Sequence, residues 1–506
     1  MSAPTFDLGK LHGGLRLDGH KAESTAAPIL EVPVPDQLVL PIQQHAGVPA
    51  QPIVDVGERV LKGQVVAEPD GEMGVPVHAS SSGKVVAIER WPVIRRYGDA
   101  APCIVIACDG EDEAAPAERG HDFRSSEPAD LLLQILDGGI VGLGGAVFPT
   151  AQKLMQGRTS GVGYLLLNGV ECEPYISCDD VLMRERAAEI VSGAQVLLHA
   201  LQAGTCYLAV ESDKPEAIQR LSEVLAEADD DRIVLKKVPT IYPSGGEDQL
   251  IQLVMNREVP SGGLPTDVGC LVQNVGTAAA VHDWIVEGQP LISRVTTITG
   301  DGVASPVNVR ARIGTTVADA IEAAGGYKGE PRHLVIGGPM TGKSITTDEV
   351  PLVKASNCVL VLANTPATGT PLPCIRCGEC AAVCPTQLLP QQLYWYACAD
   401  DEQKLRDFGL IDCIECGCCD LVCPSHIPLT ADFRTAKARI RELADEKARA
   451  ERARRRFEAR NDRLEREQQE RDDELARQKE TVRKAGADAI AEILARKRRD
   501  DEDGAS

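Results

Sequence analysis

Aromatic residues and long apolar runs are both scarce in this 506-residue chain. Phe, Trp and Tyr together make up 3% of it, and apolar strings such as CVLVLA at 358–363 are short. A membrane span needs roughly 18–20 apolar residues. The N-terminus, MSAPTFDLGKLHGG, has neither the basic region nor the apolar region of a secretory signal. The sequence therefore predicts a protein made and kept in the cytosol, which meets a membrane only through partners or a surface helix.

Positive charge is also scarce outside the C-terminal tail. The net charge is −22, although the tail from Arg434 onward carries 22 Lys and Arg against 19 Asp and Glu. The rest of the chain is therefore strongly acidic and repels phosphate backbones, which argues against nucleic-acid binding. Its length predicts roughly three to five domains. The 32 Pro and 46 Gly are typical of loop-rich domains.

The 17 cysteines give no sign of a disulfide framework, which would be unusual in the cytosol. Nine of them show no grouping, and we expect most of these to be small buried residues. The nine are Cys103, Cys108, Cys172, Cys178, Cys206, Cys270, Cys358, Cys398 and Cys418.

The other eight cysteines form two copies of one phrase, C-x-x-C-x-x-C-x-x-x-C-P. The first phrase is CIRCGECAAVCPTQ (374–387) and the second is CIECGCCDLVCPSH (413–426). In ferredoxins with two [4Fe–4S] clusters, the fourth cysteine of each such run ligates the other cluster. This predicts one cluster on Cys374, Cys377, Cys380 and Cys423, and another on Cys413, Cys416, Cys419 and Cys384. Tetrahedral zinc is the alternative.

Between the two phrases, the linker is expected to form a helix. Its aromatic string LYWY (393–396) is interpreted as core packing against the clusters.

Upstream, several glycine-rich or polar loops follow predicted strands. DGGIVGLGGAVFPTAQKL (137–154) leads into a helical pattern, and the apolar run 164–167 ends in Asn168, Glu171 and Glu173. IYPSGGEDQL (241–250) and LVQNVGTAAAVHDWI (271–285) repeat the strand-to-helix arrangement. Open α/β sheets bind ligands at such strand ends, and glycines allow close approach to an anion. A glycine run alone can also be a plain turn.

The sequences of these loops resemble those of the flavin- and NADH-binding subunit of respiratory complex I. That family's G-R-G-G-A-G-F-P-T-G-x-K loop matches 142–153, its N-x-D-E-x-E-P stretch matches 168–174, and its G-E-E loop falls on 245–247. With the cysteine phrases included, residues 30–430 resemble the RnfC family, one component of the Rnf (also called Rsx) electron-transport complexes.

The resemblance implies an FMN site and a nicotinamide site. FMN contacts map to Gly142, Gly144, Gly145, Lys153, Asn168, Gly245 and Asn274, and the catalytic carboxylates near flavin or nicotinamide to Glu171, Glu173 and Glu247. The chain departs from the family pattern at Leu143, Val147, Val170 and Gly246, which puts the affinity and pose of nucleotides in question. A helix-capping role is the alternative for Glu171 and Glu173.

The fold class expected is a multidomain α/β protein. After an N-terminal extension (1–30) we expect a lipoyl/biotinyl-like barrel-sandwich β domain (31–120), whose tip EPDGEMG lacks a carrier lysine. A Rossmann-like FMN/NADH domain (121–290), a β-grasp, SLBB-like domain (291–350), a 2[4Fe–4S] ferredoxin-like α+β domain (351–433) and a charged helical tail (434–506) follow. The tail is expected to be an exposed helix with ion pairs four residues apart.

The string GGPMTGKS (337–344) fits the pattern of a phosphate-binding loop. No long helical pattern follows it, because ITTDEVPLV is β-branched and reaches Pro351. A nucleoside triphosphate site is therefore not expected there.

The function implied by the resemblance is electron transfer among NAD(H), FMN and two [4Fe–4S] clusters, in a ferredoxin:NAD oxidoreductase coupled to ion transport. The partners implied are other subunits of a membrane complex, including an iron–sulfur ferredoxin-like subunit, and indirectly ferredoxin or flavodoxin. The location implied is the cytoplasmic face of the inner membrane, without a transmembrane segment. The alternatives are a soluble flavoprotein of the cobalamin-reductase type and a cluster-bearing adaptor with an empty nucleotide pocket.

Overall fold

The computed structural model describes residues 8–71, 73–94, 100–116, 122–330, 333–364 and 369–503. The chain divides into two compact units, 1–433 and 434–506. Within the described ranges, no helix is both long and apolar enough to cross a membrane.

A small β sandwich forms the first domain, as the sequence predicts. One antiparallel sheet has the order β2-β8-β7-β4 and the other β3-β5-β6. Apolar side chains of both sheets, such as Leu40, Val66 and Ile104, are fully buried in the core. The tip between β5 and β6 includes residue 72, which lies outside the described residues. The strands are β2 (Gln37–Pro41), β3 (Gln51–Pro52), β4 (Arg59–Val60), β5 (Val65–Glu68), β6 (Val77–His78), β7 (Gly83–Pro92) and β8 (Ala100–Cys108).

A four-stranded parallel sheet with the order β11-β10-β9-β12 forms the centre of the second domain. Its strands are β9 (Tyr164–Gly169), β10 (Thr205–Glu211), β11 (Ile233–Val238) and β12 (Cys270–Asn274). Asn168 and Asn274 are register partners at the carboxyl ends of β9 and β12. The sheet edge predicted to bind ligands therefore carries two of the predicted polar side chains side by side.

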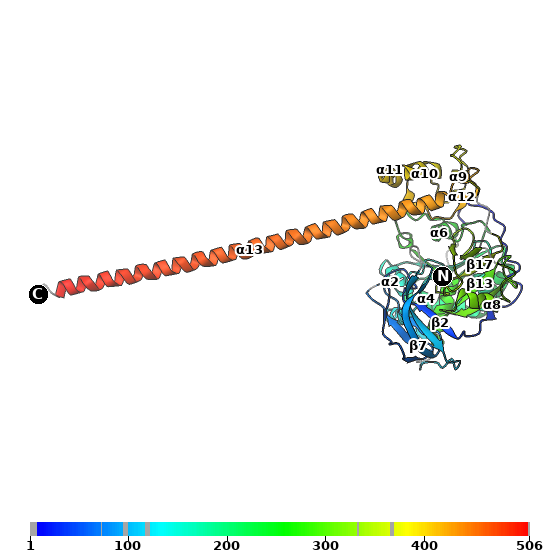
Figure 1. Ribbon diagram of the computed structural model, residues 1–506, viewed down its shortest axis with the longest axis horizontal. Coiled ribbons are helices and arrows are strands. Elements are labelled where there is room, and N and C mark those ends of the chain that lie inside the picture. The colour runs from blue at the N-terminus through cyan, green and yellow to red at the C-terminus, as the bar shows by residue number, and fades with distance from the viewer. Residues whose placement is uncertain are drawn as a thin grey trace. The chain divides into compact units, whose positions relative to one another are not determined.

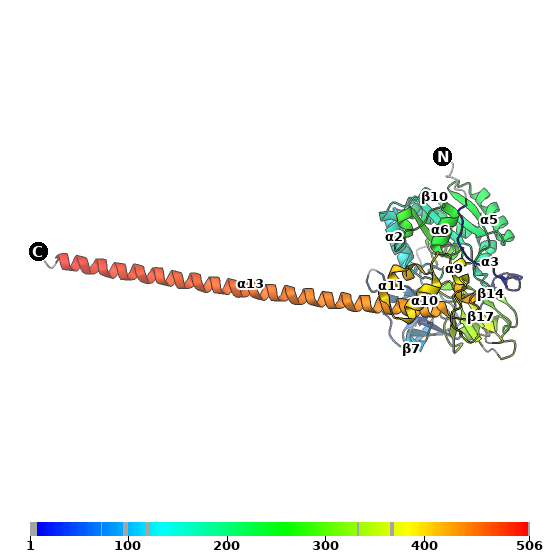
Figure 2. The same cartoon turned by 90° about the horizontal axis from the view of Figure 1, so that it is seen from above.

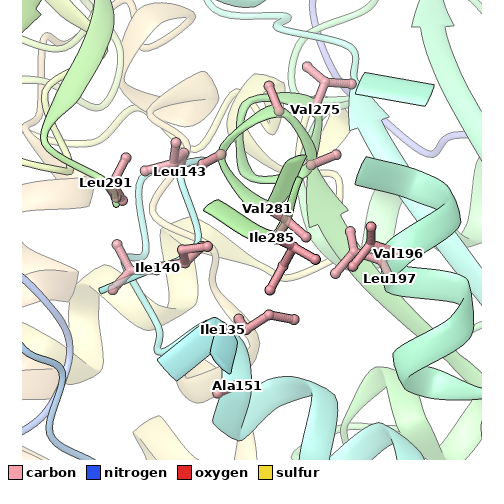
Figure 3. Packing of buried hydrophobic residues seen from close by; sticks show 14 of the residues in the cluster. Ile135, Ile140, Leu143, Ala151, Val196, Leu197, Val275, Val281, Ile285 and Leu291 are labelled. Carbon is pink, nitrogen blue, oxygen red and sulfur yellow. The ribbon is translucent and has the colours of Figure 1, made fainter. Parts of the chain in front are cut away.

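Helices surround this sheet and share a hydrophobic core with it. They are α1 (Pro128–Asp137), α2 (Thr150–Thr159), α3 (Cys178–Glu185), α4 (Ala187–Leu201), α5 (Pro215–Ala228), α6 (Glu247–Met255) and α7 (Val275–Ile285). Figure 3 shows Ile135 of α1 beside Ile285 of α7 in this core. Leu143, from the glycine-rich loop, lies near Leu291 in the same cluster (Figure 3).

The β-grasp domain is larger than predicted. Its sheet has the order β1-β14-β13-β17-β15-β16. The strands are β1 (Leu30–Glu31), β13 (Ser293–Thr299), β14 (Val307–Arg312), β15 (His333–Ile336), β16 (Lys343–Ile345) and β17 (Cys358–Leu362), with helix α8 (Val317–Ala323). Because β17 pairs with both β13 and β15, this sheet extends beyond the predicted boundary at 350. The apolar string CVLVL is a central strand of this sheet, not the start of the cysteine region.

The cysteine region contains four short α-helices, one within each phrase and two between the phrases. They are α9 (Glu379–Ala382), α10 (Pro390–Cys398), α11 (Glu402–Asp407) and α12 (Cys418–Leu421). In both views this region lies next to α6 (Figure 1 and Figure 2). Leu393 of the LYWY string is fully buried, whereas Trp395 is 44% exposed. The interpretation of these four residues as core packing is therefore wrong for Trp395.

Helix α13 (Leu429–Asp503) makes up the described part of the charged tail. Its side chains between residues 441 and 498 are almost all exposed. Ion pairs four residues apart, such as Arg455–Glu451 at 2.8 Å and Lys484–Glu480 at 3.0 Å, follow the prediction. Each such pair contributes only about 0.3–0.5 kcal/mol.

The N-terminal segment runs along the rest of the first unit. The Gly14 N–H donates to the Val383 carbonyl in the first phrase (2.9 Å), and Leu15 pairs with Tyr242 of the α/β domain. Further on, the Tyr175 N–H donates to the Gly19 carbonyl (2.7 Å). This segment therefore joins the cysteine region to the α/β domain.

Candidate functional site

A cavity of about 630 Å³, called here the large pocket, opens at the carboxyl ends of β9 and β12. Six of the seven predicted flavin residues line it, and Gly145 does not. All three predicted carboxylates, Glu171, Glu173 and Glu247, also line it. The lining residues from the four loops are Gly142, Gly144, Lys153, Asn168, Glu171, Glu173, Gly245, Glu247 and Asn274.

Two asparagines hold the loops of the large pocket together. The Asn168 side chain donates to the Gly245 carbonyl (2.9 Å) and accepts from the Val170 N–H (3.1 Å). Asn274 caps α7 by accepting from the Gly276 N–H (2.8 Å), and its amide donates to a carboxylate oxygen of Asp179 (2.6 Å). Both side chains are therefore structural as well as exposed to the pocket.

Glu171 caps helix α3 from inside the pocket. Its carboxylate accepts from the Asp179 N–H (2.6 Å) and the Asp180 N–H (3.2 Å). The capping alternative considered for Glu171 therefore holds. Burial nevertheless raises the pKa of Glu171 to about 7 from its usual 4.5, and the charge of Asp179 acts in the same direction.

Lys153 and Glu247 pair with each other. The Lys153 Nζ lies 2.5 Å from the Glu247 Oε1, and both side chains are partly exposed at the pocket. A lysine of α2 and a carboxylate at the start of α6 thus lie together on one wall. An anionic ligand here would compete with Glu247 for this lysine.

Glu173 binds the GGPMTGKS loop of the β-grasp domain. Its carboxylate accepts from the backbone N–H groups of Met340 (3.0 Å) and Thr341 (2.8 Å), and from the Thr341 hydroxyl (2.5 Å). Strand β16 follows the glycines of this loop, where a phosphate-binding loop would lead into a helix.

Leu143, where the family pattern has arginine, is buried with 7% of its surface exposed. Its N–H donates to the Thr277 hydroxyl (2.9 Å), and its carbonyl accepts from the Arg294 guanidinium (2.7 Å). Arg294, from β13, is itself buried and lines the large pocket. The departure at 143 therefore gives the loop an apolar anchor, while a guanidinium from another domain lies beside it.

The last cysteine of each phrase lies with the first three cysteines of the other phrase. The outer cavity is lined by Cys374, Cys377, Cys380 and Cys423. The inner cavity is lined by Cys384, Cys413, Cys416 and Cys419. The structure thus brings together the same two groups of four that the spacing predicts as ligand sets.

The inner cavity and the large pocket meet at Cys416, which lines both. The Tyr242 hydroxyl, from the α/β domain, donates to the Cys416 carbonyl (2.7 Å). Sequence reasoning missed the contact of Tyr242, although this residue lies in the 241–250 loop, because nothing in the chain marks it as a neighbour of a cysteine phrase. It missed Arg294 altogether, because nothing near Arg294 in the chain marks it as a neighbour of the 137–154 loop.

The remaining cysteines divide by burial. Cys418 is fully buried and lines the inner cavity. Cys172 is partly buried and lines the large pocket, while Cys398 is exposed. The others are buried, except the partly buried Cys108.

Three family models match the chain: an RnfC barrel sandwich hybrid domain at residues 9–111, a Nuo51 FMN-binding domain at 135–283 and an SLBB domain at 295–344. An RnfC protein of Yersinia pestis bv. Antiqua, named as part of an ion-translocating oxidoreductase complex, is 45% identical over 88% of this chain and 72% of its own length. The chain belongs to the RnfC family. The Pseudomonas aeruginosa protein of the same name is 49% identical over 88% of this chain, which spans 58% of that protein. A Vibrio cholerae relative is 43% identical over 96% of this chain and 63% of its own length.

Among solved structures, an NAD⁺-reducing [NiFe]-hydrogenase in the H₂-reduced state is similar, at 20% identity and a TM-score of 0.45. The match covers 62% of this chain and 61% of that one. A likeness at this level carries no argument about function.

Proposed function

We propose that this protein exchanges electrons between NAD(H) and a chain of FMN and two [4Fe–4S] clusters, and passes them to partner subunits. The observation that carries the proposal is Cys416, because it lines both the large pocket and the inner cavity. A cofactor in the pocket and a cluster in the inner cavity would then be neighbours.

The large pocket suits a flavin nucleotide. About 630 Å³ falls within the usual range of ligand sites, roughly 300–1,000 Å³. A Cβ added at Gly142 or Gly144 would meet no atom closer than 3.5 Å, so the loop backbone lies open to the pocket. We propose that this loop, Lys153, Asn168, Gly245 and Asn274 hold the FMN. When bound, FMN converts the two-electron exchange of a nicotinamide into the one-electron exchange of clusters.

Gly145 has a different role in the proposal. It does not line the cavity, but its φ of +107° is a backbone conformation that glycine adopts readily. We propose that Gly145 shapes the turn of the flavin loop instead of contacting the flavin.

The two cysteine cavities suit iron–sulfur clusters. Four of the cysteines at each cavity match the donor set of a [4Fe–4S] cluster, with Cys418 as a fifth cysteine at the inner one, and clusters of this type pass single electrons. The exchange of Cys384 and Cys423 between phrases supports clusters over two zinc ions, because it is the arrangement of two-cluster ferredoxins.

The carboxylates around the pocket have distinct proposed roles. A Glu171 with a pKa of about 7 could hold or release a proton at neutral pH, next to the proposed flavin. Glu247 pairs with Lys153 and would exchange this contact when a phosphate enters. Glu173 is treated separately below, because the β-grasp loop engages its carboxylate.

The assembly follows from the family. The relatives are named as parts of an ion-translocating oxidoreductase complex. We propose that this chain is likewise a peripheral electron-transfer subunit at the cytoplasmic face of the inner membrane. Its proposed partners include a ferredoxin-like iron–sulfur subunit and, through the complex, ferredoxin or flavodoxin.

The test is anaerobic stopped-flow spectroscopy of the iron-reconstituted, FMN-loaded protein with NADH. Bleaching of flavin followed by bleaching of the cluster absorbance is expected. Flavin that does not bind, or that NADH leaves oxidised, would support the adaptor with an empty pocket. Turnover with a corrinoid acceptor in washed, partner-free protein would favour the cobalamin-reductase alternative.

A further inference from the structure

The GGPMTGKS loop holds one carboxylate of its own chain through three hydrogen bonds. Two backbone N–H groups, of Met340 and Thr341, and the Thr341 hydroxyl point at the Glu173 carboxylate at 2.5–3.0 Å. Consecutive backbone N–H groups of this kind form a nest for anions. Glu173 therefore occupies the place that the sequence pattern would offer to a phosphate.

Gly338 makes this contact possible. A Cβ added there would lie 2.5 Å from the Glu173 Oε1 and 2.6 Å from its Cγ. Gly337, the preceding residue, has a φ of +96°, which is a glycine conformation. Gly338 thus allows the close approach of the carboxylate, and Gly337 allows the turn that aims the N–H groups.

The other side of the same loop lies next to the second phrase. A Cβ added at Gly417 would lie 3.3 Å from the Met340 carbonyl oxygen and 3.5 Å from the Met340 Cε. Gly417 directly follows Cys416, which lines the inner cavity and the large pocket. One short loop therefore spans from a pocket carboxylate to the backbone of a proposed cluster ligand.

We propose that Glu173 is a positioning residue: it fixes the 337–342 loop so that Met340 supports the Cys416–Gly417 segment beside the large pocket. The inference rests on the proposed function, because the step that Glu173 would affect is electron transfer between the large pocket and the inner cavity. Three donors converge on one carboxylate, so the contact fixes both the position and the direction of the loop. Loss of the clamp frees Met340 and changes the surroundings of the inner cluster alone.

The primary test uses Glu173→Gln and Glu173→Ala in the full-length, cluster-loaded protein. Glu349→Gln is the matched control, because Glu349 is an exposed acid of the same domain. EPR spectra of dithionite-reduced protein report both clusters without NADH. We expect a changed signal for one of the two clusters in both Glu173 variants and an unchanged spectrum in the control.

Kinetics give the second readout. After NADH addition, the ratio of the cluster-reduction rate to the flavin-bleaching rate is expected to fall about tenfold in Glu173→Ala. Thr341→Val removes one donor and should give the same change in smaller size, whereas Thr341→Ser keeps the hydroxyl and should restore the wild-type ratio.

Hydrogen exchange tests the clamp itself. The Met340 and Thr341 amides should exchange faster in Glu173→Ala than in the wild type or in Glu349→Gln. Unchanged exchange and unchanged EPR, with only a raised KM for NADH, would overturn the inference and make Glu173 a nicotinamide contact. If NADH fails to bleach the wild-type flavin while the EPR and exchange changes are present, the proposed function fails and the positioning role stands.

Discussion

The two cysteine phrases have the same spacing but unequal surroundings. In the first phrase Cys377 is exposed, and Ile375 beside it is 67% exposed. In the second phrase Cys418 and Cys419 are buried, and the large pocket is lined by Cys416 and Ile414. The second phrase therefore lies against the large pocket, whereas the first phrase exposes Cys377 and Ile375.

This difference indicates the order of the two cavities on an electron path from the large pocket, which the sequence does not. Tyr242 donates a hydrogen bond to the Cys416 carbonyl of the second phrase, and the 337–342 loop lies next to Gly417. Among the residues that the structure describes, the outer cavity is lined by residues within 374–429, and none of these lines the large pocket. Electrons from the pocket should therefore reach the inner cluster first and leave through the outer one.

The largest effect is expected when either phrase loses its last cysteine. Cys384→Ala should destroy the inner cluster, although Cys384 belongs to the first phrase, and Cys423→Ala should destroy the outer one. Each variant should lose about four of eight irons. Iron analysis with EPR measures this.

Cys398→Ala, which removes an exposed cysteine between the phrases, is the control and should keep all the iron. If Cys384→Ala removed the same EPR signal as Cys374→Ala, each phrase would hold its own cluster. This result would contradict the ligand sets proposed for the two cavities.

The free energy of unfolding should depend on pH through Glu171 of the large pocket, and not through an acid of the first phrase. Because burial raises the pKa of Glu171 from 4.5 to about 7, the folded state holds a proton that the unfolded state has released over this window. The contribution of Glu171 to the free energy of unfolding therefore falls as pH rises from about 4.5 to 7. Glu171→Gln should flatten this slope, as measured by thermal unfolding at several pH values.

Glu379→Gln, at an exposed acid of the first phrase, should leave the slope as it is in the wild type. A slope that persists in Glu171→Gln would mean that another group carries the proton.

Tyr242→Phe should have a smaller effect that is confined to the inner side. It removes the hydrogen bond to the Cys416 carbonyl, which is worth about 1 kcal/mol. We expect a shifted EPR signal or reduction potential for the inner cluster and no change for the outer one. Tyr396→Phe, on α10, is the matched control. Equal shifts in both clusters would show that Tyr242 acts on the whole region.

These predictions separate what the sequence can tell from what it cannot. The eight cysteines and the loops at 142–153, 168–174 and 245–247 are predictable, because each motif is local in the chain. The contacts that orient them join residues far apart: Glu173 and Thr341 are 168 positions apart, and Tyr242 and Cys416 are 174. Such contacts between domains leave no periodicity or spacing in the sequence.

Two further differences have the same origin. The apolar string of β17 cannot reveal which sheet it joins, so the sequence places it in the cysteine region, whereas it lies between β13 and β15. In the sequence, Leu143 replaces the arginine of the family pattern and so removes a charge from the loop. In the structure Leu143 is buried, and the Arg294 guanidinium donates to its carbonyl.

The smallest effect is expected from the tail. Truncation after Lys447 removes the part of α13 from residue 448 onward, whose described side chains are almost all exposed. Iron content, flavin binding and the order of cluster reduction should match the full chain, as measured by the same spectra. A loss of either cofactor would show that the tail supports the first unit.

The most direct measurement is rapid-freeze EPR after NADH is mixed with the Cys384→Ala and Cys423→Ala proteins. With the inner cluster absent, the outer cluster should stay oxidised in the presence of NADH although dithionite reduces it. With the outer cluster absent, the inner one should be reduced at the wild-type rate. Reduction of the outer cluster at the wild-type rate in Cys384→Ala would contradict the path from pocket to inner to outer cavity.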